Sequence, residues 1–276
     1  MGQAKKKRLC PAVGREVGSA ECGAHRASSY TCAEVCESNP WAPDHYDQAL
    51  GIEDRLGKKL GDRLSTDGSS AGRPPTSSLE LEAQQFFLRE ILLNRDLSGR
   101  SFVDRWAAEG FKGLNNDERF LLGRQALMRP AVVEVRRILS DEECEAIDLL
   151  DPQAAPFVVH DRSLAARAVR FSVLLGLVYD MPHYRRMFGM ALELPSVGIL
   201  ASVAVVRETA RHLGGPDETE ALRGWLFANY VRMGQAFQAI DLAMRKQLLV
   251  NASFDYTKTA YRLKCSPEDF VSVMKR

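Results

Sequence analysis

The sequence predicts an α+β fold: a metal-stapled cysteine module, a linker, and a mainly helical body that contains a small antiparallel β-barrel or curled sheet. Three observations lead to this prediction. Four of the six cysteines fall within residues 10–36. Residues 65–78 are rich in Gly, Ser and Pro and lack large apolar side chains, as flexible linkers do. Within residues 79–276 the spacing of apolar residues changes from helical to strand-like and back again.

The cysteine module is expected to span residues 1–46. It ends in the segment 39–43, where two prolines indicate a stiff, turn-prone exit. A segment of this size with few apolar residues cannot bury enough apolar surface to order itself, so a metal staple would supply the missing free energy. A short helix over 47–64 should follow, because apolar residues recur there at roughly helical spacing: Tyr46, Leu50, Leu56, Leu60 and Leu64.

The first part of the body, residues 79–129, is predicted to be helical. Ser101 and Asn116 are suitable N-cap residues, and Pro130 should stop the last of these helices. The expected helices span 79–94, 101–110 and 115–128.

Residues 131–194 are predicted to be rich in strands. Turn residues separate several short apolar runs, and five short strands at close spacing suggest a small antiparallel barrel or curled sheet. Residues 164–169 are an ambiguous stretch for which a helical turn is the alternative. The expected strands are 132–139, 146–150, 157–160, 171–179 and 186–194.

Residues 197–250 are predicted to form a second helical region. One helix should span 197–213 and end at Gly214 and Gly215, because glycine favours the backbone conformation that terminates helices. A second, long helix should begin at Pro216, with apolar residues recurring at the helical period. A terminal hairpin and a short helix are expected over 254–274.

Cys10, Cys22, Cys32 and Cys36 are the predicted metal ligands. Structural zinc sites are tetrahedral and prefer thiolate donors, and a helical turn would place Cys32 and Cys36 on one face. An iron–sulfur cluster uses the same four thiolates. Two further alternatives remain: the thiols are free or redox-active, or His25 replaces one cysteine.

Part of this segment resembles the SEC-C zinc motif. Cys22-Gly23-Ala24-His25-Arg26 and Tyr30-Thr31-Cys32 match the middle of that motif, over about 27 of the 276 residues. The sequence departs from it because Cys10 precedes Cys22 by twelve residues and because Cys32 and Cys36 are not adjacent. The resemblance implies a zinc-binding accessory module that contacts protein or nucleic acid, in a bacterial protein.

Composition and motifs exclude several other classes. The 37 basic and 36 acidic side chains nearly balance, whereas proteins that coat nucleic acid usually carry a basic excess. No apolar stretch has the length of a membrane span, so a cytoplasmic location is expected, and there cysteines are more often metal ligands or free thiols than disulfides. Phosphate-binding, hydrolase and metalloprotease motifs are all missing from the sequence, so no catalytic residues are predicted.

These observations predict a zinc-binding, non-enzymatic binding or adaptor protein with a protein partner. The alternative is a nucleic-acid-associated factor that uses the basic N-terminus and the metal module. That alternative depends on the basic run 5–8 and on a basic edge of the expected barrel: Arg162, Arg167, Arg170, His183, Arg185 and Arg186.

Overall fold

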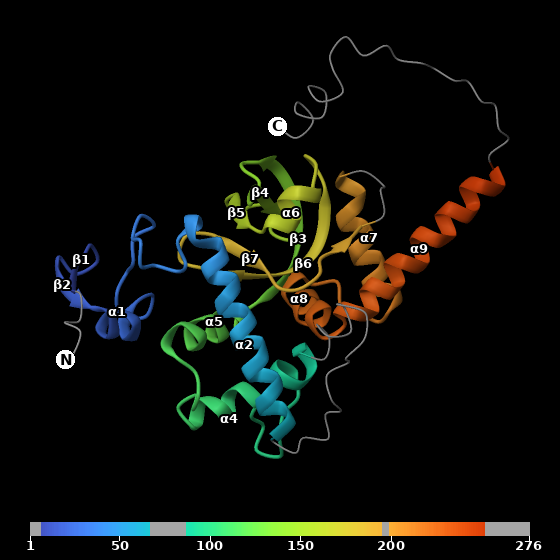
Figure 1. Ribbon diagram of the computed structural model, residues 1–276. Coiled ribbons are helices and arrows are strands. Elements are labelled where there is room, and N and C mark those ends of the chain that lie inside the picture. Colours follow the sequence, from blue (N-terminus) through green and yellow to red (C-terminus); the bar gives the residue numbers. More distant parts are fainter. Residues whose placement is uncertain (1–6, 67–86, 195–198, 252–276) are drawn as a thin grey trace, which may run out of the picture. The chain divides into compact units, whose positions relative to one another are not determined.

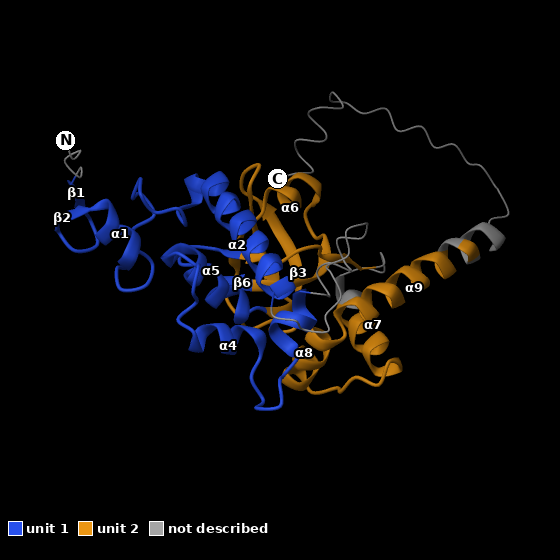
Figure 2. Ribbon diagram, turned by 60° about the horizontal axis from the view of Figure 1, so that its bottom comes forward, with its two compact units in different colours: residues 1–128, 179–185 blue, residues 129–178, 186–276 orange. Residues whose placement is uncertain are grey.

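The computed structural model describes residues 7–66, 87–194 and 199–251. The chain divides into two compact units, which Figure 2 shows in different colours. Unit 1 comprises Met1–Met128 and Tyr179–Arg185, and unit 2 comprises Arg129–Val178 and Arg186–Arg276. The predicted mixture of helices and strands is confirmed.

Unit 1 combines a small two-stranded sheet with helices (Figure 1). The sheet pairs β1 (Lys7–Cys10) with β2 (Arg15–Gly18) in antiparallel register, and Gly14 in the connecting turn has a φ of 65°. The expected cysteine module contained no regular strands, so this hairpin was not predicted. The helices that follow are α1 (Ser19–His25), η1 (Pro43–His45), α2 (Tyr46–Thr66), η2 (Leu88–Leu93), α4 (Phe102–Ala108) and α5 (Asn116–Ala126).

Helix α2 covers the segment in which a short helix was expected, and it buries one apolar stripe that includes Ile52, Leu56 and Leu60. It also continues through two residues that were assigned to the linker. The Ser65 hydroxyl donates a hydrogen bond to the Gly61 carbonyl (2.9 Å) and the Thr66 hydroxyl to the Arg63 carbonyl (2.9 Å), so both residues complete the last helical turn. The rest of the predicted linker lies outside the described residues.

The helix caps in unit 1 follow local sequence signals. Ser101 caps α4, as predicted, and forms a capping box with Asp104. Helix α5 is capped by Asn115 and not by Asn116, because Asn115 stands three residues before Glu118 and exchanges hydrogen bonds with it (2.8 and 2.9 Å). The described part of the predicted helix 79–94 is η2, a π-helix.

Unit 2 contains the predicted barrel, which is closed and has five strands. The strands follow the order β3-β4-β5-β7-β6, and β3 pairs with β6 to close the barrel. Residues 164–169 follow the helical alternative, because α6 (Arg162–Arg167) lies there between the third and fourth barrel strands. The strands are β3 (Arg129–Ile138), β4 (Glu143–Asp148), β5 (Phe157–His160), β6 (Val173–Asp180) and β7 (Arg185–Met187).

The predicted strand 186–194 is two strands in the structure. Gly189 has a φ of 61°, outside the extended region, and it separates β7 from β8 (Leu192–Glu193). Strand β8 pairs with β6 outside the closed barrel.

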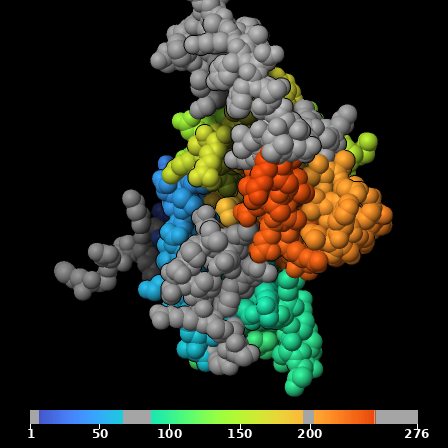
Figure 3. All heavy atoms as spheres, turned by 90° about the vertical axis from the view of Figure 1, so that its right-hand side faces the viewer, coloured from blue at the N-terminus to red at the C-terminus, as the bar shows by residue number. Residues whose placement is uncertain are grey.

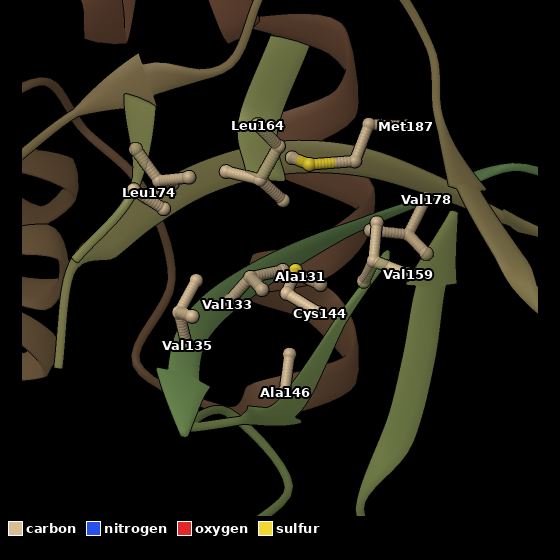
Figure 4. Close-up of a cluster of buried hydrophobic side chains, with 11 residues drawn as sticks. Ala131, Val133, Val135, Cys144, Ala146, Val159, Leu164, Leu174, Val178 and Met187 are labelled. Atoms are coloured by element: carbon tan, nitrogen blue, oxygen red, sulfur yellow. The ribbon is translucent and has the colours of Figure 1, made fainter. Parts of the chain in front are cut away.

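Small apolar side chains fill the barrel (Figure 4). Three alternate residues of β3, Ala131, Val133 and Val135, are in this core, as the two-residue period of a strand requires. A Cβ at Gly176 would lie 2.0 Å from the Met187 Cε atom, so a larger residue there would displace the end of the Met187 side chain. Burial raises the pKa of the Cys144 thiol to about 12, so Cys144 is a protonated core residue. The core residues labelled in Figure 4 are Ala131, Val133, Val135, Cys144, Ala146, Val159, Leu164, Leu174, Val178 and Met187.

Three helices complete unit 2: α7 (Ile199–His212), α8 (Thr219–Ala228) and α9 (Tyr230–Asn251). Helices α7 and α9 lie side by side (Figure 3). The predicted end of α7 is confirmed, because Gly214 has a φ of 85° and the Gly215 amide donates to the Ala210 carbonyl (2.7 Å). None of the described helices is long and apolar enough to cross a membrane.

The prediction of a single long helix from Pro216 onward is wrong, because the structure has two helices there. Asn229 interrupts it with backbone angles of −116° and 21°, and both its amide and its side chain donate to the Trp225 carbonyl (2.9 Å each). Tyr230 then starts α9, with its hydroxyl 2.8 Å from the Leu175 carbonyl of the barrel. The helical period continues through the break, which is why the sequence did not reveal it. The terminal hairpin and helix predicted over 254–274 lie outside the described residues.

Candidate metal centre

Two of the four predicted ligands lie in regular structure. Cys10 is the last residue of β1, and its carbonyl accepts a hydrogen bond from the Gly14 amide (2.9 Å) across the hairpin turn. Cys22 lies in α1, which follows β2 directly (Figure 1). Both thiols are buried and form one small cluster with Val17. The hairpin and the helix thus hold Cys10 and Cys22 in fixed positions.

Cys32 and Cys36 lie in the loop 31–42, and both are half-buried. The Cys36 amide donates to the Ala33 carbonyl (3.2 Å) and the Cys36 carbonyl accepts from the Asn39 amide (2.8 Å), so this segment is a succession of single turns. The helical face that would have aligned Cys32 and Cys36 is therefore not formed. Gly23, which follows Cys22, lies within α1.

The other three thiols lie within electrostatic range of Cys32. The pKa of Cys32 is raised, first by burial and then by the charges of Cys36, Cys22 and Cys10, while a hydrogen bond from the Ala27 backbone opposes the rise. Thiolate charges affect one another only at short range. All four predicted ligands therefore lie in one part of unit 1, but only Cys10 and Cys22 share a buried cluster.

Arg26 lies beside this group and was not identified from the sequence. Its Nε atom donates to the Asp117 carboxylate (2.6 Å), its Nη2 atom pairs with the same carboxylate, and its Nη1 atom donates to the Ser38 carbonyl (2.8 Å). Burial lowers the pKa of Arg26, but Asp117, Cys22 and Cys32 together raise it above its ordinary value. The guanidinium group thus joins the cysteine segment to α5 and lies near two thiols.

The histidines of the segment have other contacts. The Nδ1 atom of His25 is 3.3 Å from the Ser29 hydroxyl, and its ring lies 5.2 Å from that of Tyr30. The Nδ1 atom of His45 is 2.6 Å from the Asn39 carbonyl. Nothing in these contacts favours His25 as a replacement for one of the cysteines.

The four thiols do not form a coordination shell in the part of the chain that the structure describes. Across residues 7–66, 87–194 and 199–251, no group of three or more His, Cys, Asp and Glu side chains is arranged to hold a metal ion. The residue types match those that zinc prefers, whereas the positions of the sulfur atoms do not yet match a tetrahedron.

The basic residues invoked for nucleic-acid binding have mixed surroundings. Arg162 pairs with Glu142, Arg185 pairs with Asp180 (2.6 Å), and Arg186 is buried. In the N-terminal run, Lys7 and Arg8 lie in β1, and the two preceding lysines lie outside the described residues. The continuous basic edge that the sequence suggested is therefore interrupted, because two of its arginines are paired with acids and a third is buried.

Comparison of the chain with models of protein families, with curated proteins and with solved structures finds no match. The resemblance to the SEC-C motif therefore stays a prediction.

Proposed function

We propose that the cysteine segment binds one zinc ion through Cys10, Cys22, Cys32 and Cys36, and that the chain acts as a non-enzymatic binding protein. The observation that supports this proposal is that Cys10 and Cys22 share a buried cluster in unit 1, with Cys32 in electrostatic range of the other three thiols. Thiolate sulfur is the preferred donor of structural zinc sites. A centre with four thiolates carries net negative charge, and Arg26 offers a cation beside two of them.

Completing the site would require a movement of the loop that carries Cys32 and Cys36. Isolated turns hold this loop, whereas a sheet and a helix hold Cys10 and Cys22. The hairpin pair would therefore be the fixed half of the site and the loop pair the adjustable half. The free energy of zinc binding in small zinc peptides, on the order of ten kcal/mol, exceeds the cost of reshaping a few turns.

Metal analysis of the purified chain tests the proposal. We expect one zinc per chain, and a large loss of zinc in each Cys→Ser variant at the four positions, because a three-thiolate site binds zinc much more weakly. Cys144→Ser is the matched control: Cys144 is buried in the barrel of unit 2 and should leave the zinc content unchanged. A metal-free wild-type chain after growth in zinc-supplemented medium would contradict the proposal.

The same samples distinguish the alternatives. An iron–sulfur cluster would give iron, acid-labile sulfide and visible absorption in place of zinc. Free or redox-active thiols would all react with a thiol reagent in the native protein, whereas zinc-bound thiolates react only after a chelator is added.

Arg26→Ala is expected to lower the free energy of unfolding of unit 1 by about 1.5–3 kcal/mol, the usual contribution of hydrogen bonds to charged groups. The substitution removes every hydrogen bond from Arg26 to the Asp117 carboxylate and leaves that carboxylate without its guanidinium partner. Zinc affinity should fall as well, because a cation next to Cys22 and Cys32 is lost. Denaturant unfolding and zinc competition titrations measure the two effects.

Arg15→Ala is the control for Arg26→Ala. Arg15 is an exposed residue in the same hairpin, and it pairs with Glu21. Surface ion pairs contribute little, so the control should change stability by under about 1 kcal/mol. Equal effects of the two substitutions would show that Arg26 has no special role.

The binding role is tested by affinity capture with the zinc-loaded chain. A partner that is retained by the wild-type chain and lost by Cys32→Ser would assign recognition to the cysteine segment. Robust, metal-dependent turnover in hydrolase and transferase substrate panels would overturn the non-enzymatic part of the proposal.

A further inference from the structure

An exposed aromatic residue lies in the turn between α6 and β6. Phe171 has a φ of 70°, in the left-handed region that bulky residues rarely adopt, and 40% of its surface is exposed. Its amide donates to the Val135 carbonyl (2.7 Å), and the Val135 amide donates to the Ser172 carbonyl (2.9 Å). The turn is thus tied to the barrel wall, and the strained residue is held in place by main-chain hydrogen bonds.

Two arginines lie against the Phe171 ring. The guanidinium carbon of Arg170 is 4.7 Å from the ring centroid and that of Arg136 is 5.9 Å away, both within cation–π distance. The Nε atom of Arg136 lies 2.6 Å from a carboxylate oxygen of the fully buried Glu134. The ion pair with buried Glu134 therefore holds Arg136 in place, with its guanidinium group near the Phe171 ring.

The positive charge of this turn is only partly neutralised. Arg167 and Arg170 are exposed, and neither has an ion pair within the part of the chain that the structure describes. By contrast, Arg162, which lies on α6 together with Arg167, pairs with Glu142. We call the group the Phe171 platform and define it by four residues: Arg136, Arg167, Arg170 and Phe171.

We propose that the Phe171 platform binds single-stranded nucleic acid. Unpaired bases stack on aromatic rings and on guanidinium planes, and the free arginines are suited to the adjoining phosphates. Small five-stranded barrels are among the architectures that bind oligonucleotides. An acidic peptide would use the cations but not the ring. The proposal does not depend on zinc, because the platform lies within unit 2 and the cysteine segment within unit 1.

The backbone supports a role for the ring outside the core. Glycine would adopt the left-handed conformation of residue 171 without strain, so a phenylalanine there costs stability. Phe171 nonetheless keeps 40% of its surface exposed. Strained, exposed side chains of this kind are typical of binding sites.

Fluorescence anisotropy of the full-length chain with labelled oligothymidylate and oligouridylate, each of about 16 nucleotides, tests the proposal. We expect binding that weakens steeply with salt, and weaker binding to a duplex of the same length. Phe171→Gly should reduce affinity roughly tenfold or more, because base stacking is lost. Phe171→Tyr keeps the ring and should bind like the wild type.

Arg170→Ala should reduce the slope of log affinity against log salt by about 0.7, the value for one phosphate contact to a single strand. Arg211→Ala is the control, because it also removes one positive charge. Arg211 lies on α7, outside the platform, and pairs with Asp217 (3.0 Å), so its loss should leave the slope unchanged. A thermal melt of each variant checks that it is folded at the temperature of the binding measurement.

Three results would overturn the proposal. They are the absence of binding at low salt, equal affinity for duplex and single strand, and unchanged affinity in Phe171→Gly. Binding of the wild-type chain to anionic lipid vesicles, with no binding to either oligonucleotide, would instead assign the platform to a membrane surface.

Discussion

Arg223→Ala is expected to lower the free energy of unfolding of unit 2 by about 3–5 kcal/mol, the usual cost of breaking a buried ion pair from one side. The Nη1 atom of Arg223 lies 2.9 Å from the Asp148 carboxylate, and the two side chains are only 10% and 4% exposed. Arg223 also donates to the Pro130 carbonyl (2.7 Å). Its removal leaves a buried carboxylate without its cation and a buried carbonyl without that donor.

Denaturant unfolding, followed by a signal that reports on unit 2, measures this effect. Arg211→Ala is the control, because Arg211 is an exposed arginine on α7 and its loss should change stability by under about 0.5 kcal/mol. Adding Asp148→Asn to Arg223→Ala should recover part of the loss, since it removes the unpaired charge. It also keeps an oxygen that can accept from the Val132 and Leu150 amides, which Asp148 binds at 3.2 and 3.0 Å. A loss below about 1 kcal/mol in Arg223→Ala would show that the pair is not a determinant of stability.

Trp41→Ala is expected to lower the free energy of unfolding of unit 1 by about 3–5 kcal/mol, as truncation of a core tryptophan does. Trp41 is 0% exposed, and its ring lies 5.4 Å from that of Phe120 on α5. Asn39 fixes the backbone there, because its side-chain oxygen accepts from the Trp41 amide (3.1 Å). The exit of the cysteine segment is therefore part of the core of unit 1.

Trp41→Phe separates ring packing from the polar indole group. The indole N–H of Trp41 is buried and has no hydrogen-bond partner among the described residues, so losing it costs nothing in hydrogen bonding. We expect Trp41→Phe to recover most of the stability that Trp41→Ala loses, leaving a deficit of about 1 kcal/mol for the smaller ring. If Trp41→Ala changed the zinc content but not the unfolding of the helices, the segment would be a separate module held only by its metal.

Local signals in the sequence were sufficient to predict many helices and strands of this fold. Ser101 caps α4 because a hydroxyl followed by an acid three residues later satisfies free amides within one turn. The strand β5 lies where its apolar run predicted it, and the five strands form the expected barrel. These signals depend on neighbours in the chain, and no distant contact is needed to read them.

Other features depend on contacts between residues far apart in sequence. Arg26 meets Asp117 across 91 positions, and neither residue carries a local mark of that pairing. The segment 179–185 belongs with unit 1 although it connects two barrel strands, and Tyr179 binds Glu53 (2.7 Å). The break at Asn229 falls within an unbroken apolar period, so periodicity alone gave no reason to expect it.

By itself the sequence determined which residue types are available: four thiols near the N-terminus, a strand-rich centre and capped helices. Only the tertiary structure decided that Cys10 and Cys22 share a buried cluster while Cys32 and Cys36 lie in turns, and that Phe171 stands between two arginines. The physical reason is the distance along the chain over which each kind of interaction acts. Propensity and capping act within a few residues, whereas burial and charge pairing depend on segments that only the folded chain brings together.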